Sequence, residues 1–426
     1  MNIQQRATNG LKLLFKDVDG FSQVQASWRF LNNPKVEIDE LFSPVLDNLN
    51  SQINKQCDKY LLAASDWSWV DFKNYASKNE LIKENNRGTS KKIGYDLQTT
   101  LALSDRTGEP IAPISHSLKT SKKVYSTYDD NMDIKLTHLE ALTKGIKSIS
   151  KLVKTDKKIV HIVDRESDSI AFMRDLIKDN NLFLLRVKNN SKVFYHNEDL
   201  EKDIEIKQID LVDKLSLGTK VKTIKYKGKK ATIYVNECDI IIKRDATKKR
   251  KNEDGKNQVQ RIKGDPIKLR FIVERLIDDK GEIVAQWLLV SNLFDTSITS
   301  ETLATWYYHR WKIESYFKLL KSSGFNLEQW QQIEPEALFK RLLIVSQACM
   351  LVWQIANDNS DNAKKIRDFL IQLSGKQIQR GVNFTYPSLL AGLESYLTMM
   401  DILVKFDIND LLKMKEELTD IMGFEI

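Results

Sequence analysis

The polar residues with the most specific spacing lie in the segment Thr305–Lys321, TWYYHRWKIESYFKLLK. Tyr307, Arg310, Glu314 and Lys321 stand at positions i, i+3, i+7 and i+14. On one continuous helix, at roughly 100° per residue, these four side chains project within about 60° of one another. A face with one acid, two cations and a phenol suits contact with an anionic polymer.

Apolar residues of the same segment predict an adjoining stripe that attaches this helix to a core: Trp306, Ile313, Phe317 and Leu320. The simpler alternative is a surface helix with an Arg310–Glu314 ion pair, because pairs four residues apart are common. The base precedes the acid, which is the less favourable order for helix stability, and aromatic residues are interleaved with the charges. Both features favour a chemical role.

Two aspartates follow short apolar runs. Asp66 follows Tyr60–Ser65, YLLAAS, and Asp164 follows Lys158–Val163, KIVHIV, so each acid is expected at the end of a buried strand. Either carboxylate could instead cap a turn or the next helix. If an α/β sheet brings them together with Glu314, the three acids provide oxygen ligands of the kind that Mg²⁺ prefers. Two such ions would support phosphoryl transfer without a covalent enzyme intermediate.

Composition limits the class of protein. The 426 residues suffice for two or three domains, and 66 basic against 58 acidic residues give a net charge of +8, which favours a polyanionic partner. Three well separated cysteines predict neither a disulfide framework nor a zinc site. The N-terminal sequence MNIQQRATNGLKLLF lacks an apolar signal core, and no run has the length of a membrane span. We expect a cytoplasmic protein without a membrane partner.

The order of elements predicts a mixed α/β sheet between helical ends. Helices are expected at Thr137–Val153 and Ser167–Lys178, and a hairpin turn at Asp105–Gly108. Short β segments follow, as expected of an inserted subdomain: Lys220–Tyr226, Ala231–Val235, Asp239–Ile242 and Lys268–Leu276. The basic segment Lys243–Lys263 predicts a mobile loop, and a solvated hairpin tip is favoured over a contact with phosphates.

Several motifs together resemble one family. The pattern Y-x2-R-x3-E-x6-K, the DRESD sequence at Asp164–Asp168, the Phe183-x-x-Arg186 pair and the stretch QASWRFLNNPKV are similar to motifs of the hairpin-forming DDE transposases of bacterial insertion sequences. That group includes the transposase of the composite kanamycin-resistance transposon. This chain has Trp28 where the family usually has tyrosine, and Trp67-Ser68 where threonines commonly follow the first aspartate.

The resemblance implies an α/β fold with a ribonuclease H-like catalytic core and an inserted β-subdomain, flanked by N-terminal and C-terminal helical regions. The implied division is an N-terminal helical DNA-binding region at 1–55, a core at 56–190 and 287–330, a β insertion at 191–286, and a helical dimerisation region at 331–426.

The resemblance also implies roles for individual residues. The metal triad would be Asp66, Asp164 and Glu314, holding two Mg²⁺ ions for which Mn²⁺ substitutes. Phosphates near the cleaved end would contact Tyr307, Arg310 and Lys321. Trp287 would stack on a flipped base, and Arg186 and Trp311 would line the DNA; for both tryptophans the alternative is a place in the core.

The expected activity is cut-and-paste transposition: binding of inverted-repeat ends, nicking, formation and opening of a terminal hairpin, and strand transfer. Expected partners are double-stranded DNA, as transposon ends and target, and a second copy of the chain in a synaptic complex at the nucleoid. The main alternative is a non-catalytic, transposase-derived DNA-binding regulator, because family members usually carry a further helical segment ahead of Gln4. A second alternative is a ribonuclease H-like nuclease that cuts DNA without making a hairpin.

Overall fold

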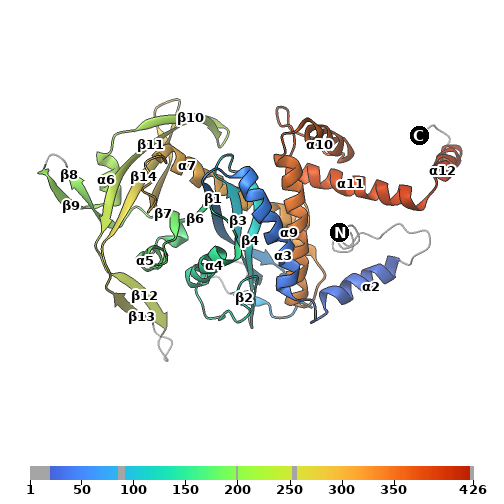
Figure 1. The fold of residues 1–426 in the computed structure, drawn as a ribbon, viewed down its shortest axis with the longest axis horizontal. Helices are drawn as coiled ribbons and strands as arrows, with labels where there is room; N and C mark the ends of the chain where they lie inside the picture. Colours follow the sequence, from blue (N-terminus) through green and yellow to red (C-terminus); the bar gives the residue numbers. More distant parts are fainter. Residues whose placement is uncertain (1–19, 85–91, 198–199, 252–256, 423–426) are drawn as a thin grey trace.

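The computed structural model describes residues 20–84, 92–197, 200–251 and 257–422, and the first 19 residues of the expected N-terminal region lie outside it. Within these residues one mixed sheet of 13 strands dominates (Figure 1). In spatial order its main path is β5 (Val124–Ser126), β4 (Pro110–Lys119), β3 (Lys92–Ser104), β1 (Tyr60–Asp71), β6 (Lys158–Val163), β7 (Leu182–Arg186), β15 (Ile283–Ser291), β14 (Ile267–Asp278), β11 (Lys229–Ile242), β8 (Lys192–Asn197) and β9 (Lys202–Lys207). Outside the main path, β2 (Ile82–Glu84) pairs with β3, and β10 (Thr219–Tyr226) pairs with β11. This arrangement confirms the prediction of a mixed α/β fold.

The register of three strands positions the two aspartates. β1 pairs antiparallel with β3 and parallel with β6, and Ser65 is paired with Val163. Asp66 and Asp164 each follow a residue of this pair, so both acids lie at the same level of adjacent parallel strands. The first half of β1 is buried on both faces, as expected of a central strand covered by helices.

Helices cover both faces of the sheet (Figure 1). On one face α4 (His138–Leu152) and α5 (Ile170–Lys178) share a core with Val163 of β6. On the other face α3 (Ile38–Gln56) and α9 (Pro335–Asn357) share a core with Ile162. α4 begins with a capping box between Thr137 and Glu140, which stabilises its first turn.

The helix α9 is the one helix of the described residues that is long and apolar enough to cross a membrane. Most of it is buried against α3 and the sheet, which is the position of a core helix in a folded domain.

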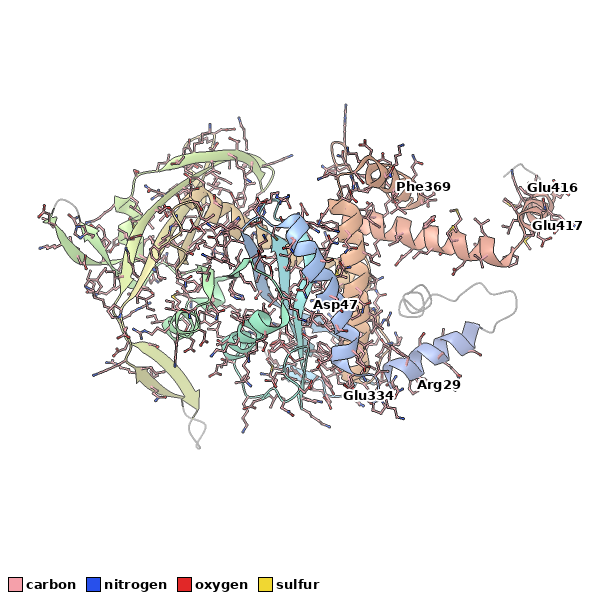
Figure 2. The ribbon with its side chains drawn as sticks, in the orientation of Figure 1. Arg29, Asp47, Glu334, Phe369, Glu416 and Glu417 are labelled. Atoms are coloured by element: carbon pink, nitrogen blue, oxygen red, sulfur yellow. The ribbon has the colours of Figure 1, made fainter. Side chains whose placement is uncertain are left out.

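Four further helices lie toward the two ends of the chain: α2 (Gly20–Leu31), α10 (Asp361–Leu373), α11 (Tyr386–Lys405) and α12 (Ile408–Met422). α10 packs against α11 and α9. α2, α11 and α12 project away from the sheet (Figure 1). α11 and α12 together form the C-terminal arm, and Glu416 and Glu417 lie at its far end (Figure 2).

The inserted segment differs from its predicted form in two ways. Ala231–Val235 and Asp239–Ile242 belong to one 14-residue strand, β11, and β14 and β15 continue the sheet directly from β7. The segment Lys243–Lys263 is not an irregular loop in its described residues, because β12 (Ala246–Lys251) and β13 (Asn257–Ile262) pair as a two-stranded ribbon, which agrees with the hairpin that was also expected there. A short helix, α6 (Gln208–Lys214), joins β9 to β10. The division into domains stays a prediction.

Candidate active site

The segment with the characteristic spacing is divided into three pieces. α7 (Ser300–His309) and α8 (Trp311–Lys318) meet at Arg310, and a π-helical turn at Leu319–Ser323 follows. At the junction the amide of Arg310 donates to the Tyr307 carbonyl at 3.1 Å, a tight turn with i→i−3 bonding. The prediction of one continuous helical face is therefore wrong, because the winding changes before Lys321. The apolar stripe is present as predicted: Trp306, Ile313, Phe317 and Leu320 are all buried.

Arg310 links the first aspartate to the glutamate. Its Nη1 donates to Asp66 Oδ2 at 2.7 Å, and its Nη2 donates to Glu314 Oε1 at 2.9 Å. The Arg310 side chain is only 5% exposed, against 22% for Asp66 and 38% for Glu314. Two acids that are 248 positions apart in the sequence thus share one buried guanidinium.

Asp164 lies beside this group on the neighbouring strand. Its Oδ1 accepts a hydrogen bond from the Glu166 amide at 2.9 Å and so caps a short 3₁₀ turn, Arg165–Ser167. Its charge acts on Asp66 and Glu314 and raises the pKa of each. Asp164 therefore combines the capping role with a place in the electrostatic environment of the site.

Burial controls the protonation of the site. Desolvation raises the pKa of Asp66 and of Glu314, and Arg310 opposes the shift without cancelling it. Burial alone would lower the pKa of Arg310, but Tyr307, Asp66 and Glu314 together raise it. The three carboxylates hold more negative charge than one guanidinium can balance, so a further cation would be favoured here.

The three carboxylates fit a metal ion by their chemistry but not by their present positions. Carboxylate oxygens are the ligands that Mg²⁺ takes, so the residue types fit. Within the described ranges, however, no three His, Cys, Asp or Glu side chains lie close enough together to hold one ion. Arg310 stands between two of the three acids, and its withdrawal would have to accompany metal binding.

Three of the residues predicted to bind DNA lie near Arg310: Tyr307, Arg186 and Trp311. Tyr307 is buried, and its hydroxyl makes no hydrogen bond of good geometry with any residue that the structure describes. Arg186 ends β7, and its charge acts on the Tyr307 hydroxyl. Trp311 begins α8 and is 52% exposed, with its ring 5.8 Å from the Arg310 guanidinium carbon.

Lys321 and Trp287 lie apart from the bridged acids. Lys321 Nζ donates to the Trp69 carbonyl and lies 3.4 Å from Glu328 Oε1, so it contacts neither Asp66 nor Glu314. Trp287, on β15, is half-buried, and its ring meets Tyr226 edge-on at 6.2 Å.

Sequence reasoning missed a buried acid opposite this tryptophan. Glu274 on β14 is paired in register with Trp287, is 4% exposed, and has a pKa raised to about 7 by burial. The positive charge of Lys222 opposes this shift. The signal was an acid inside the apolar run IKLRFIVERLID, but the sequence gives no indication of its partner strand.

A second missed group joins the segments that follow the two aspartates. His138 Nε2 is 2.5 Å from Asp96 Oδ2, its Nδ1 is 3.5 Å from Glu166, and its ring stacks on Trp67 at 4.9 Å. The hydrogen bond with Asp96 raises the pKa of His138. This histidine therefore supports the segments beside both acids from the opposite face of the sheet.

Glu274→Gln is expected to stabilise the fold at pH 8 and to have little effect at pH 4.5. The folded-state pKa is higher than that of an unfolded glutamate, so stability falls as pH rises from about 4.5 to 7. An amide does not ionise, and the gain at pH 8 should be about 2 to 3 kcal/mol. Urea unfolding at both pH values measures it, with the exposed Glu282→Gln on the same hairpin as control. An equal effect of Glu274→Gln at both pH values would contradict the assignment.

Residues 133–353 match the family described as "Transposase DDE domain". The match includes Asp164 and Glu314 and begins after Asp66. A solved structure that resembles the chain is described as "Cryo-EM structure of piggyBac transposase synaptic complex with hairpin DNA". It has 12% identity and a TM-score of 0.35, and the alignment covers 95% of this chain and 71% of that chain.

A TM-score of 0.35 is too low to support any argument about fold or chemistry. The family match is sufficient without it, because it spans more than half of the 426 residues. It also contains the strand that ends at Asp164 and the helix that carries Glu314. The chain therefore belongs to the DDE transposase family.

Proposed function

We propose that this chain is a cut-and-paste DNA transposase of the hairpin-forming group. The observation that carries the proposal is the buried Arg310 bridge between Asp66 and Glu314, with Asp164 on the adjacent parallel strand. Acids from three distant segments lie near enough there to act on one another electrostatically, with an excess of negative charge. A simple surface ion pair between Arg310 and Glu314 would require neither the burial of the guanidinium nor the two further acids.

The proposed core is ribonuclease H-like. This is supported by the strand order β4-β3-β1-β6-β7, in which the first three strands are antiparallel and β6 and β7 continue parallel to β1. In this scheme the first acid lies on the central strand and the second at the end of its parallel neighbour.

Asp66, Asp164 and Glu314 would hold two Mg²⁺ ions, for which Mn²⁺ would substitute. When bound, these ions would activate the attacking hydroxyl and stabilise the leaving oxygen. Arg310 would then exchange its carboxylate partners for phosphate oxygens of the DNA, which guanidinium binds well. The Tyr307 hydroxyl, which makes no hydrogen bond of good geometry within the described residues, would donate to the same phosphate.

The other residues predicted to bind DNA would contact it farther from the cleaved phosphate. Trp311 is exposed beside the bridge and Arg186 lies near Tyr307, and these positions support the proposal that both residues line the DNA. Half-buried Trp287 would stack on a base flipped out of the hairpin end, since an aromatic face recovers part of the unstacking cost. Lys321 would reach phosphate only after leaving the Trp69 carbonyl.

The activity is tested with labelled DNA ends from the sequence that flanks the gene, incubated with Mg²⁺ and run on a denaturing gel. A hairpin product, absent with internal DNA of equal length, is the expected result. Cutting without a hairpin would favour the plain nuclease. Specific binding without cleavage by any divalent ion would favour a transposase-derived regulator that inhibits transposition.

The proposed partners are inverted-repeat ends, target DNA and a second copy of the chain, which would act together at the nucleoid in the cytoplasm. Pairing of copies is supported by the C-terminal arm, where large apolar side chains are exposed. Val404 is 81% exposed, Ile408 60%, Leu412 56% and Ile421 80%. Val404 belongs to α11 and the other three residues to α12, and exposed apolar side chains gathered in this way are typical of a surface that a partner covers.

Ile408→Asp with Leu412→Asp is expected to prevent assembly of two chains on two DNA ends. Charges on the contact face would have to be buried at a cost of several kcal/mol. Light scattering coupled to size-exclusion chromatography measures the mass of the complex with DNA. Asn409→Asp with Thr419→Asp, polar positions on the same helix, should leave assembly intact. Paired complexes formed equally well by both variants would exclude α12 from the interface.

A further inference from the structure

A large cavity lies beside α8, apart from the bridged acids. Its volume is about 1120 Å³, and its walls come from the end of α3, the turn after β3, α8, the end of α9, α10 and the start of α11. Six cations line it: Lys55, Arg106, Lys312, Lys318, Lys364 and Arg367. They come from four elements distributed over more than 300 residues, so the fold itself assembles this basic groove.

The charge of the basic groove is nearly all of one sign. Glu109 is the one acid among its lining residues, and it is already held by Lys312 Nζ at 2.8 Å and by the Tyr386 hydroxyl. Arg367 is buried and donates to the Ile355 carbonyl at 2.8 Å, so it belongs to the wall. Lys55, Lys318 and Lys364 are exposed and can reach a ligand in the groove.

Where the lining cations pair with acids, the pairs are exchangeable. Arg106 Nη2 lies 2.6 Å from Asp58, and Lys364 lies 2.9 Å from Asp361, and both pairs are largely exposed. Exposed pairs contribute little to stability, so a phosphate can replace the acid at small cost. Amides and hydroxyls complete the wall, among them Asn357, Asn383 and Thr385. These groups carry no charge that would repel a phosphate, although the Asn357 amide already donates to the Pro110 carbonyl and the Thr385 hydroxyl to Ser388.

The basic groove begins close to the candidate active site. Lys312 and Lys318 lie on α8 on either side of Glu314, and Lys318 is one helical turn, or about 6 Å along the axis, beyond it. A polymer that lies in the groove therefore runs beside the helix that carries the glutamate.

We propose that the basic groove binds the phosphate backbone of a DNA segment other than the one at the bridged acids. The proposal rests on the proposed function in one respect, the identification of DNA as the polyanion. Two sources have this chemistry: the transposon end continuing past the cleavage point, or the target duplex. Each lysine that neutralises a phosphate releases counterions, so binding should depend steeply on salt.

The test is fluorescence anisotropy of a labelled random-sequence 30-base-pair duplex between 50 and 200 mM salt. Lys55→Glu, Lys318→Glu and Lys364→Glu are combined in one variant. The control combines Lys135→Glu, Lys151→Glu and Lys178→Glu, which are exposed lysines near α4 and α5, with an identical change of charge. The groove variant should bind at least about tenfold more weakly than the control, with a salt slope lower by about 3.

Equal binding by the two triple variants overturns the proposal. Because three acids could disturb folding, the corresponding Lys→Gln set is measured as well, with thermal unfolding of every variant. It should show a smaller loss in the same direction, and a folded Lys→Gln set without any loss also overturns the proposal.

Two further arms separate this proposal from the proposed function. If the chain cuts no DNA but the groove variants still lose binding, the transposase activity fails and the groove stands. If strand transfer falls while hairpin formation persists, the occupant is target DNA, and if both fall, it is the transposon end.

Discussion

Asp66→Asn and Glu314→Gln are each expected to reduce the rate of DNA cleavage by at least about 1000-fold while leaving DNA affinity within a few-fold. An amide has nearly the size of the carboxylate and can still accept from Arg310, so the fold should persist. It lacks the negative charge that the proposed ions require. Loss of several kcal/mol of transition-state stabilisation corresponds to a factor of this size. Cleavage is followed on labelled DNA ends at a saturating protein concentration.

A matched control and a second readout make this result specific. Asp71→Asn lies on the same strand, five residues beyond Asp66, and should cleave normally. Isothermal titration with Mn²⁺ in the absence of DNA should give weaker binding for Asp66→Asn than for Asp71→Asn. Cleavage by Asp66→Asn at the unmodified rate would remove Asp66 from the proposed triad. Equal loss in both variants would point to distortion of β1.

Arg310→Gln is expected to lower the free energy of unfolding by about 2 to 4 kcal/mol at pH 7 without divalent ions, and by less at pH 5. Removing one partner of a buried pair leaves the other charge uncompensated, and the partial exposure of Glu314 moderates the cost. Without the guanidinium, the pKa values of Asp66 and Glu314 rise further in the folded state. A raised folded-state pKa of an acid gives stability that is lost as pH rises, so the variant is weakest at high pH.

Urea unfolding at pH 5 and pH 7 measures this effect, and Mg²⁺ provides a further test. An ion that binds the two freed acids stabilises the folded state by mass action, so Mg²⁺ should restore part of the loss in Arg310→Gln. Arg275→Gln is the control: Arg275 is equally buried but donates to backbone carbonyls of Val212 and Ser216. Its loss should be independent of Mg²⁺. If Arg310→Gln has the same stability at both pH values and no response to Mg²⁺, the bridge does not control the charge of the site.

The sequence was sufficient for one of the two strands that carry the aspartates, whereas the strand expected to end at Asp66 continues as β1 to Asp71. β6 spans Lys158–Val163 as predicted, because an uninterrupted apolar run that ends in an acid has few other solutions in an α/β sheet. The helix expected at Thr137–Val153 is present as α4 within one residue at each end, since its capping box defines the start. α5 begins three residues later than predicted, because Asp164 caps a separate 3₁₀ turn before it.

The arrangement around Arg310 could not be predicted from spacing alone. Whether Arg310 turns toward Glu314, toward Asp66 or toward both depends on where α8 lies on the sheet, and this is decided by packing of Ile313 and Phe317 in the core. Lys321 left the expected face because the winding becomes π-helical at Leu319, a change without a clear local signal. The basic groove has no signature either, because its walls come from segments far apart in the chain.

The uninterrupted hydrogen-bonding from β7 into β15 has a consequence for protein engineering. β15 begins in the part of the chain that was predicted as an insertion, and its last three residues pair with β7, from Leu289 opposite Arg186 to Ser291 opposite Leu184. Excision of 191–286 would therefore remove β14 and the first four residues of β15, and the rest of β15 would become an unpaired strand edge available for self-association. The minimal soluble catalytic fragment of this protein should retain that segment, however variable its outer ribbon proves among natural sequences.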